Sequence, residues 1–415
     1  MQRSLSWAWW LIPATLFAQT PSDTTLIREL LREALDNNPR VGAARSIARA
    51  ADARVPQARA WDPPALGVSW MEVPTSTLNP FSGTMERRYQ IEQMIPFPGK
   101  VGAAVDAAAA GSRMALARTA SFERTLVAGV KRQYAQLFAA QRRLQINTEQ
   151  QRTLDQLLSA VETKYAVGRA QQVDVLRLSI ESRKLENERS ELERELLSAG
   201  GLLNSLLGRP VEQSWPSLPP LPMTLPSMPL QEIQGAAAQN RPELLMADAG
   251  ISMAQADLTM AKREYWPDLA LGGAFTDRTM VPDSWDLMVG IRIPIAPWSI
   301  GATGGRVAER TAILSATERN RDDMRRMASF EVNDQWNRMK TQWDQADRYR
   351  RAILPEARQV LEALRGAYQT NSADFLSLID SFRMLQMFEM ELIMKEMDYQ
   401  MSRAMLEEAV GMELP

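Results

Sequence analysis

The sequence predicts a mainly α-helical chain with a small β part, organised as an internal two-fold repeat. Apolar residues recur every seven positions over long stretches, which is typical of helices that pack as coiled coils. Four short stretches alternate large apolar residues with small or polar ones, as half-buried strands do. One offset, 203 residues, brings the two halves of the 415-residue chain into register. A helix of about 64 residues extends about 95 Å, so we expect an elongated molecule.

The first element is an expected signal peptide at residues 1–18. Arg3 is followed by an apolar run from Leu5 to Ala18 that ends in a small residue, which is the arrangement of a secretory signal. The alternative, a membrane anchor, needs about 20 apolar residues to cross a bilayer. The run is shorter than that, so we expect export from the cytoplasm.

Each repeat is expected to begin with helices and to continue with two strands. The first helical segments cover 24–60 and 228–263, and both end at prolines. The alternating stretches that follow predict four strands, at about 65–73, 87–95, 269–275 and 285–293. Long helices at about 101–164, 171–208, 300–366 and 373–411 complete the two copies.

The register between the copies holds at both ends of each repeat and shifts to 198 residues between them, where Ile95-Pro96 falls on Ile293-Pro294. Tyr165 falls on Tyr368 and Gly208 falls on Gly411, both at the separation of 203 residues. The predicted units are a first repeat at 19–208, a linker at 209–230 and a second repeat at 231–415. Seven prolines in the linker favour an extended, semi-rigid strap over a folded domain.

Composition narrows the chemistry that the chain can perform. It contains no His and no Cys, which excludes the usual zinc ligands, thiolate nucleophiles, disulfides and His-dependent triads. The formal net charge of −2 lacks the basic surplus of nucleic-acid binders. Gly99-Lys100 lacks the earlier glycine of a phosphate-binding loop. We therefore expect no enzyme activity, no cofactor, no metal site and no nucleic-acid partner.

Four strands are too few to close a membrane barrel, because the smallest such barrels have eight. Strands pooled from two chains would give eight, and strands from three chains would give twelve and room for a lumen. We expect a multi-chain tube with its barrel in an outer membrane and its helices in the periplasm. The alternative is a soluble periplasmic coiled-coil adaptor or structural protein that carries a small hairpin domain.

An ordered set of motifs resembles the TolC-type outer membrane efflux proteins. The resemblance covers essentially the whole mature chain and repeats in both halves. It is carried by Ala34-Leu35-Asp36-Asn37-Asn38-Pro39, Ile95-Pro96-Phe97-Pro98-Gly99-Lys100, Tyr165-Ala166-Val167-Gly168 with Asp174-Val175-Leu176, Leu203-Asn204-Ser205-Leu206-Leu207-Gly208-Arg209-Pro210 and Arg241-Pro242-Glu243-Leu244.

The resemblance implies a homotrimer with a twelve-stranded outer membrane β-barrel and a long helical periplasmic tunnel. Such a protein is the passive exit duct of a tripartite efflux or type I secretion system. Its implied partners are a periplasmic adaptor (membrane fusion protein), an inner-membrane transporter of the resistance-nodulation-division type and outer membrane lipid. The Ile95–Lys100 turn is most similar to the heavy-metal efflux branch, so heavy-metal ions or small toxic compounds are the expected cargo.

Two helix-turn-helix tips are expected at Tyr165 with Gly168 and at Tyr368 with Asn371. Gly168 and Asn371 are residues that can adopt the left-handed conformation that ends a helix. The family resemblance implies that these tips dock the adaptor at the closed periplasmic end. The alternative is an ordinary helical hairpin turn without a docking role.

Asp174, Arg177 and Asp380 are candidate gate residues. The family carries inward carboxylates nine and twelve positions after the tip tyrosine. Here Asp174 and Asp380 fill one such place in each copy, whereas Arg177 and Ser377 fill the other two. Three-fold repetition would bring like charges together and favour cation attraction or pairing with Arg177. The alternative is a solvated or helix-pairing Asp. Asp374 is expected to cap the return helix.

Two further sets of side chains are candidates. Methionines recur every three or four residues along the last helix, which suits either a thioether path for copper or silver ions or an ordinary helix core. Aromatic residues near strand ends suit a membrane-interface belt or packing at the junction between barrel and tunnel. The methionines are Met384, Met387, Met390, Met394, Met397, Met401 and Met405, and the aromatics are Trp70, Tyr89, Trp285 and Trp298, with Trp61 and Trp266.

Overall fold

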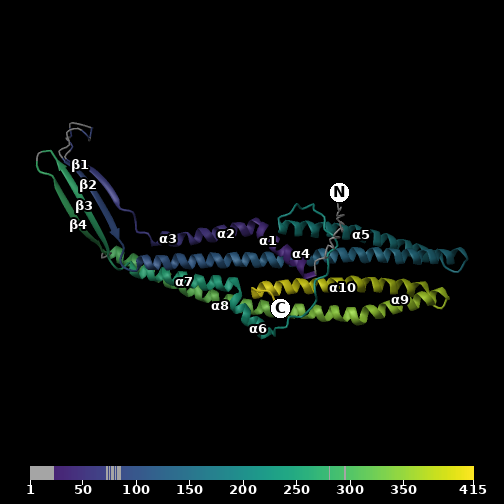
Figure 1. Cartoon of the computed structure of the whole chain (residues 1–415). Helices are drawn as coiled ribbons and strands as arrows, with labels where there is room; N and C mark the ends of the chain where they lie inside the picture. The colour runs from purple at the N-terminus through teal and green to yellow at the C-terminus, as the bar shows by residue number, and fades with distance from the viewer. Residues whose placement is uncertain are drawn as a thin grey trace, which may run out of the picture.

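The computed structural model describes residues 23–71, 73, 75, 79, 81, 86–279, 281–293 and 296–415, with the side chains of 23, 24 and 297–299 excepted. The expected signal peptide at 1–18 lies outside these residues. The molecule is elongated, with a sheet at one end and long helices running away from it to two hairpin turns at the other (Figure 1). The predicted mainly helical fold with four strands is confirmed.

The two halves of the chain contain similar elements in similar order. The first half comprises α1 (Asp23–Asn37), α2 (Pro39–Asp52), α3 (Arg54–Arg59), β1 (Ala65–Met71), β2 (Glu86–Ile95), α4 (Lys100–Ala166) and α5 (Gln172–Leu207). The second comprises α6 (Leu230–Asn240), α7 (Pro242–Arg263), β3 (Asp268–Arg278), β4 (Ser284–Arg292), α8 (Pro297–Arg348), η1 (Tyr349–Ile353), α9 (Leu354–Gln369) and α10 (Phe375–Val410).

The four strands form one antiparallel sheet in the order β1-β2-β3-β4. The central β2–β3 pair joins the two halves of the chain in a register that runs from Glu86↔Arg278 to Ile95↔Leu269. β3 is therefore longer than the sequence predicted, because β2 offers it partners over its whole length. β1 and β4 are the edges, and neither edge has a second neighbour in the described part of the chain.

The long helices differ between the halves. α4 continues for 67 residues, whereas its counterpart changes to the wider π conformation over Tyr349–Ile353 before α9 begins. Pro355, the second residue of α9, has no N–H to donate to the carbonyl of Arg351, and the π turn accommodates that lost bond. None of the helices within the described ranges is long and apolar enough to cross a membrane.

The Pro-rich strap crosses both halves and is held by one buried tyrosine from each. Tyr134 of α4 donates its hydroxyl to the carbonyl of Pro219 at 2.8 Å, and Tyr399 of α10 donates to the carbonyl of Thr224. Both tyrosines lie in apolar clusters that join a long helix to its return helix. The strap therefore ties the two helical units together.

Two glycines end the return helices in matching surroundings. Gly208 after α5 and Gly411 after α10 have φ of 75° and 79°, the left-handed region where a Cβ is strained. A Cβ on Gly208 would lie 3.2 Å from the carbonyl oxygen of Asn37, and one on Gly411 would lie 2.5 Å from that of Asn240. Each return helix thus ends against the start of its own half.

Candidate functional site

The two hairpin turns at the end of the helices are closed by the same backbone hydrogen bonds. Gly168 has φ of 72° and Asn371 has φ of 60°, as the sequence predicted for helix-ending residues. Each turn forms a short and a longer loop bond of the Schellman type. These bonds are Gly168 N to Tyr165 O (2.9 Å), Arg169 N to Lys164 O (2.8 Å), Asn371 N to Tyr368 O (3.2 Å) and Ser372 N to Ala367 O (2.8 Å).

Lys164 joins the two turns, and sequence reasoning missed it. Its Nζ donates to Asn371 Oδ1 at 2.8 Å and to the carbonyl of Tyr368, and it lies 4.2 Å from the centroid of the Tyr368 ring. The Tyr368 ring packs edge-to-face on Phe375. The 203-residue offset places Ala367 where Lys164 would be in the second turn, so each chain has one such lysine. Only its position in the last turn of α4 hinted at a bond to terminal carbonyls.

The two tip tyrosines differ in environment. Tyr165 is exposed, whereas Tyr368 is half-buried between the turns. Burial raises the pKa of the Tyr368 hydroxyl, and the negative charge of Asp174 raises it further. Asp174 of the first turn and Tyr368 of the second are therefore electrostatically coupled.

Each candidate gate carboxylate has a helix partner within the chain. Asp174 Oδ2 accepts from the backbone N of Gln171 at 3.3 Å and so caps the start of α5. Asp380 is exposed and lies 3.6 Å from the guanidinium of Arg383, one turn along α10. Arg177 is exposed, and the described residues offer it no ion pair. The predicted pairing of Arg177 with the carboxylates is therefore not formed within one chain.

Asp374 caps α10 as expected. Its Oδ1 accepts from the backbone N of Ser377 at 2.7 Å, and this hydrogen bond holds the pKa of the Asp374 carboxyl below its usual range. The capping carboxylate stands at different positions in the two copies. In α5 it is Asp174, three residues after the N-cap Gln171, whereas in α10 it is the N-cap residue Asp374 itself.

A buried ion pair links α5 to α10 and was also missed. The Glu181 carboxylate is buried and accepts from both Nη2 (2.7 Å) and Nε (3.1 Å) of Arg383. Both bonds end on the same oxygen, Oε2, and charged donor and acceptor make them stronger than neutral hydrogen bonds. Because Arg383 also lies beside Asp380, the candidate gate carboxylate is connected through it to the other hairpin.

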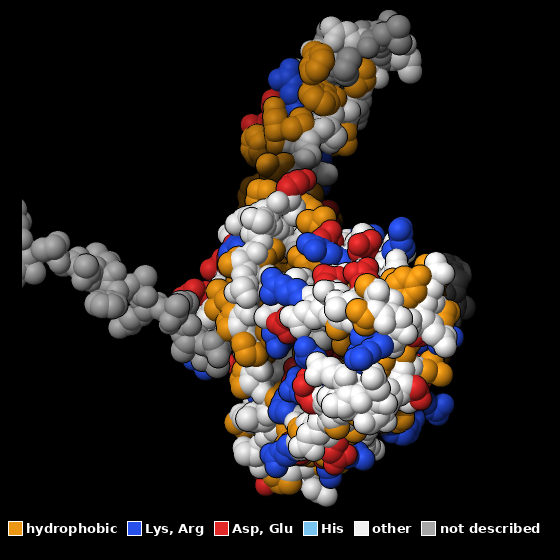
Figure 2. Space-filling view, turned by 90° about the vertical axis from the view of Figure 1, so that its right-hand side faces the viewer, with side chains coloured by type: hydrophobic (Ala, Val, Ile, Leu, Met, Phe, Trp, Pro, Cys, Tyr) orange, Lys and Arg blue, Asp and Glu red, His pale blue; other side chains and the backbone are white. Residues whose placement is uncertain are grey.

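One face of the sheet is apolar and exposed. The paired residues Tyr89, Phe275 and Trp285 form an aromatic row across three strands, and Trp285 is 77% exposed. Below the row, Ile91 and Leu287 continue the apolar surface on the same face. Figure 2 shows apolar side chains gathered over the sheet, whereas charged side chains of both signs are scattered over the helical body.

The other predicted aromatics lie elsewhere. Trp70 contacts Phe81 edge-to-face with centroids 5.1 Å apart, beyond the aromatic row. Trp298 lies in α8, and its side chain is outside the described ones. Trp266 stacks on Phe97 with centroids 5.1 Å apart, where the sheet meets the helices. Packing at that junction is thus what Trp266 does within the chain.

The turn before α4 makes this junction rigid. Lys100 Nζ lies 2.7 Å from Asp268 Oδ1, and the backbone N of Phe97 donates to the same oxygen at 2.8 Å. Arg263 donates to the carbonyl of Pro98 at 2.6 Å and fills the space beside Gly99, where a Cβ would clash. The motif residues of this turn therefore fasten the first half of the chain to the second.

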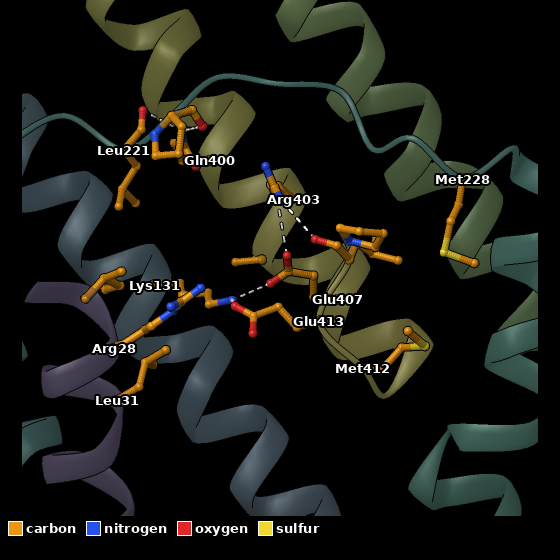
Figure 3. A pocket seen from close by; sticks show the side chains of 15 residues that line it. Arg28, Leu31, Lys131, Leu221, Met228, Gln400, Arg403, Glu407, Met412 and Glu413 are labelled. Atoms are coloured by element: carbon orange, nitrogen blue, oxygen red, sulfur yellow. Dashed lines mark hydrogen bonds and ion pairs between the residues drawn. The ribbon is translucent and has the colours of Figure 1, made fainter. Parts of the chain in front are cut away.

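A cavity of about 560 Å³ lies between α1, α4, α10 and the strap. Figure 3 shows Lys131 reaching across it to Glu407 (2.6 Å) and Glu413 (2.9 Å), and Arg403 beside Glu407 (3.3 Å). The bond from Lys131 holds the pKa of Glu413 below its usual range. These ion pairs link α4 of the first half to the end of the second half, and the rest of the cavity lining is largely apolar.

Comparison with known proteins agrees with this architecture. The model of the family described as "Outer membrane efflux protein" matches residues 30–209. The cobalt-zinc-cadmium resistance protein CzcC of Cupriavidus metallidurans is 24% identical over 300 residues, which cover 71% of this chain and 70% of CzcC. Two solved structures share the fold: the outer membrane protein VceC of Vibrio cholerae (TM-score 0.79, 17% identity, 94% and 97% of the chains covered) and the open MtrE outer membrane channel of Neisseria gonorrhoeae (0.76, 17%, 93% and 89%). Residues 30–209 therefore match the outer membrane efflux protein family, and the fold of the chain is that of the solved outer membrane channels.

Proposed function

We propose that this chain is the passive exit duct of a tripartite efflux or type I secretion system in the outer membrane. The single observation that carries the proposal is the apolar, exposed face of the sheet at one end of helices as long as α4. An apolar face with an aromatic row is what a lipid-facing sheet requires. The long helices then extend through the periplasm toward a periplasmic adaptor and a resistance-nodulation-division transporter.

Three copies would pool their strands into a twelve-stranded barrel. The edges β1 and β4 present unpaired backbone groups, which lipid does not tolerate. If β4 of one copy pairs with β1 of the next, three copies close the sheet and leave a lumen. The same three-fold arrangement would join the helices into a tunnel.

The helical contact between copies can be derived from a contact inside one chain. α7 packs against α4 of the other half, where Ser121 donates to Glu243 at 2.6 Å. The internal offset is 198 residues at the strands before α4 and α8 and 203 at the tips, so it carries Ser121 to positions 319–324 of α8 and Glu243 to Arg40 of α2. Met324 and Arg40 are both exposed. We therefore place α8 of one copy against α2 of the next. This contact would also cover Phe330, an exposed apolar residue of α8.

We also propose that the two turns joined by Lys164 form the gate and that their outer surfaces dock the adaptor. Tyr165 and Gly168 would present the first docking turn, and Tyr368 and Asn371 the second. Asp174, Arg177 and Asp380 would set the charge at the gate. The relative CzcC, a cobalt-zinc-cadmium resistance protein, supports metal ions as one class of cargo.

Cell fractionation and mass measurement in detergent test the proposal. We expect the folded protein in the outer membrane at about three times the mature chain mass, and ion conductance after its insertion into a planar bilayer. A water-soluble monomer or dimer in the periplasm would instead support the coiled-coil adaptor and would overturn the duct.

A further inference from the structure

The methionines of α10 have no equivalent in the matching helix of the other half. α10 contains seven methionines within 36 residues, and α5, which has the same length, contains none. At the positions that match Met387, Met390 and Met394, α5 carries Lys184, Asn187 and Glu191. A helix in this place of the fold therefore does not need methionine for its packing.

The methionines are not the core face of α10. The buried residues of α10 include Leu378, Phe382, Ile393, Tyr399 and Leu406, and none of the seven methionines is buried. Met390 and Met397 pack partly against Ile393. Met387 is 57% exposed. Within one chain, Met387 therefore lies outside the core, whereas Met390 and Met397 lie at its border.

Met387, Met390 and Met394 line one groove between α5 and α10, with a volume of about 510 Å³. These three residues stand one turn apart on a single helix ridge, so their side chains are adjacent. Met387 and Met394 follow Asp380 at intervals of seven residues and share its side of the helix. The groove therefore continues the surface that carries the candidate gate carboxylate.

Three cationic side chains, Arg143, Lys184 and Arg383, line the groove together with the carboxylates of Glu181, Glu188 and Glu391. Arg383 lies 2.7 Å and Lys184 3.5 Å from Glu181, Arg143 lies 2.6 Å from Glu195, and Glu391 lies 2.9 Å from Lys395. Glu188 receives a bond from Gln386 at 3.2 Å. The three thioethers are thus neutral side chains in a lining whose formal charges are balanced.

We propose that this groove binds a soft monovalent cation, Cu⁺ or Ag⁺, through the thioethers of Met387, Met390 and Met394. Thioethers are neutral, polarisable ligands that select soft ions over hard ones. The lining carries equal numbers of cationic and anionic side chains, so the neutral thioethers are the ligands of the ion. The site goes beyond the duct function, because a wide duct does not need to bind what passes through it.

The chain offers an unusually clean test, because it has no His and no Cys to bind these ions elsewhere. Ag⁺ is titrated as its nitrate, without chloride, into the detergent-extracted full-length protein in a calorimeter. The test variant replaces Met387, Met390 and Met394 by Leu, which keeps the apolar volume. The matched control replaces Met397, Met401 and Met405, three methionines further along the same helix.

We expect one strong Ag⁺ site per chain, an affinity loss of about tenfold or more in the test variant, and no comparable loss in the control. Methyl resonances of ¹³C-labelled methionine in the unaltered protein provide a second measurement that requires no variant to fold. Ag⁺ should shift the resonances of the three groove methionines first. Absence of Ag⁺ binding, or equal binding by both variants, overturns the site, and a protein that conducts ions without binding Ag⁺ would still be a duct.

Discussion

Lys164 is the side chain that most directly connects the two tips. Its ammonium group satisfies the carbonyl of Tyr368 and the side chain of Asn371, which lie on the other hairpin. A cation near helix C-terminal carbonyls is favourable, and the Tyr368 ring adds a cation–π contact. Separation of the hairpins must break all three interactions together.

We predict that Lys164→Gln loosens the tips. The amide keeps some hydrogen bonding but loses the charge, so the closed arrangement is weakened and single-channel conductance in planar bilayers should rise several-fold. Arg189→Gln is the control, because Arg189 pairs with Glu193 of its own helix at 2.9 Å, far from the contact between the hairpins. Unchanged conductance of the Lys164 variant would contradict the role of this lysine in closure.

We predict a pH dependence at the start of α10. The hydrogen bond from Ser377 lowers the pKa of Asp374 in the folded state, so its stabilising effect is present above the ordinary carboxyl pKa of about 3.9 and is lost as the pH falls through the lowered value. Hydrogen exchange of the tip peptide, corrected for intrinsic rates, should accelerate in this acidic range. Asp374→Asn keeps the capping oxygen, so its exchange should lack this dependence, whereas Asp374→Ala should exchange fast at every pH.

The residues that sequence reasoning identified and those that it missed differ in one respect. Gly168, Asn371 and Asp374 act on backbone within a few residues of themselves, so local rules found them. Lys164 and Glu181 act on partners about 200 residues away. Their roles depend on how two hairpins pack, and no pattern near either residue encodes that packing.

Among the elements, the C-terminal ends of α4, α5 and α10 allow a graded test. Gly168, Gly208 and Gly411 have nearly equal φ, but a Cβ would meet nothing within 4 Å at Gly168, an oxygen at 3.2 Å at Gly208 and an oxygen at 2.5 Å at Gly411. An alanine would therefore strain the backbone at all three positions, but its Cβ would clash with a neighbouring oxygen at only two of them, Gly208 and Gly411.

We predict that the Gly→Ala variants lose thermal stability in the order Gly411, Gly208, Gly168. The left-handed conformation should cost each variant about 1–2 kcal/mol of unfolding free energy. The contacts with Asn240 and Asn37 add to this cost at Gly411 and Gly208. Midpoints of thermal unfolding measured side by side check the order, and equal shifts in all three variants would show that the contacts contribute nothing.

The elements also show where periodicity is sufficient. Seven-residue spacing predicted the long helices, and alternation predicted the four strands, because both patterns report burial on one face. The π turn at Tyr349–Ile353 was not predicted. It follows from Pro355, which the helix tolerates by widening one turn, and periodicity over 60 residues averages such a local change away.

At the scale of the whole molecule, a single chain leaves strand edges unpaired and apolar helix surface exposed. The sheet has two open edges, and α8 exposes Met324, Met327 and Phe330. The internal offset gives these surfaces a defined partner, because each has a counterpart that is already covered within the chain. The repeat offset can be found in the sequence alone. The contact between α4 and α7, from which we derive the α8–α2 contact, is visible only in the folded chain.

We predict that Met324→Cys with Arg40→Cys crosslinks neighbouring copies through a short bis-maleimide. The natural chain has no Cys, so products report only the introduced pair. Denaturing gels should show species of two and three chain masses. Ser121→Cys with Glu243→Cys is the matched control, because it joins α4 and α7 within one chain and should leave the mass unchanged. Only single-chain masses from the first pair would contradict the proposed α8–α2 contact.

The open strand edges also have a consequence for biogenesis. An unpaired, apolar edge is a template for indiscriminate pairing with other chains, and both β1 and β4 are such edges beside exposed residues like Leu66 and Leu287. A newly exported copy is therefore aggregation-prone until its neighbours arrive. We therefore expect its yield to depend steeply on how many copies reach the membrane together.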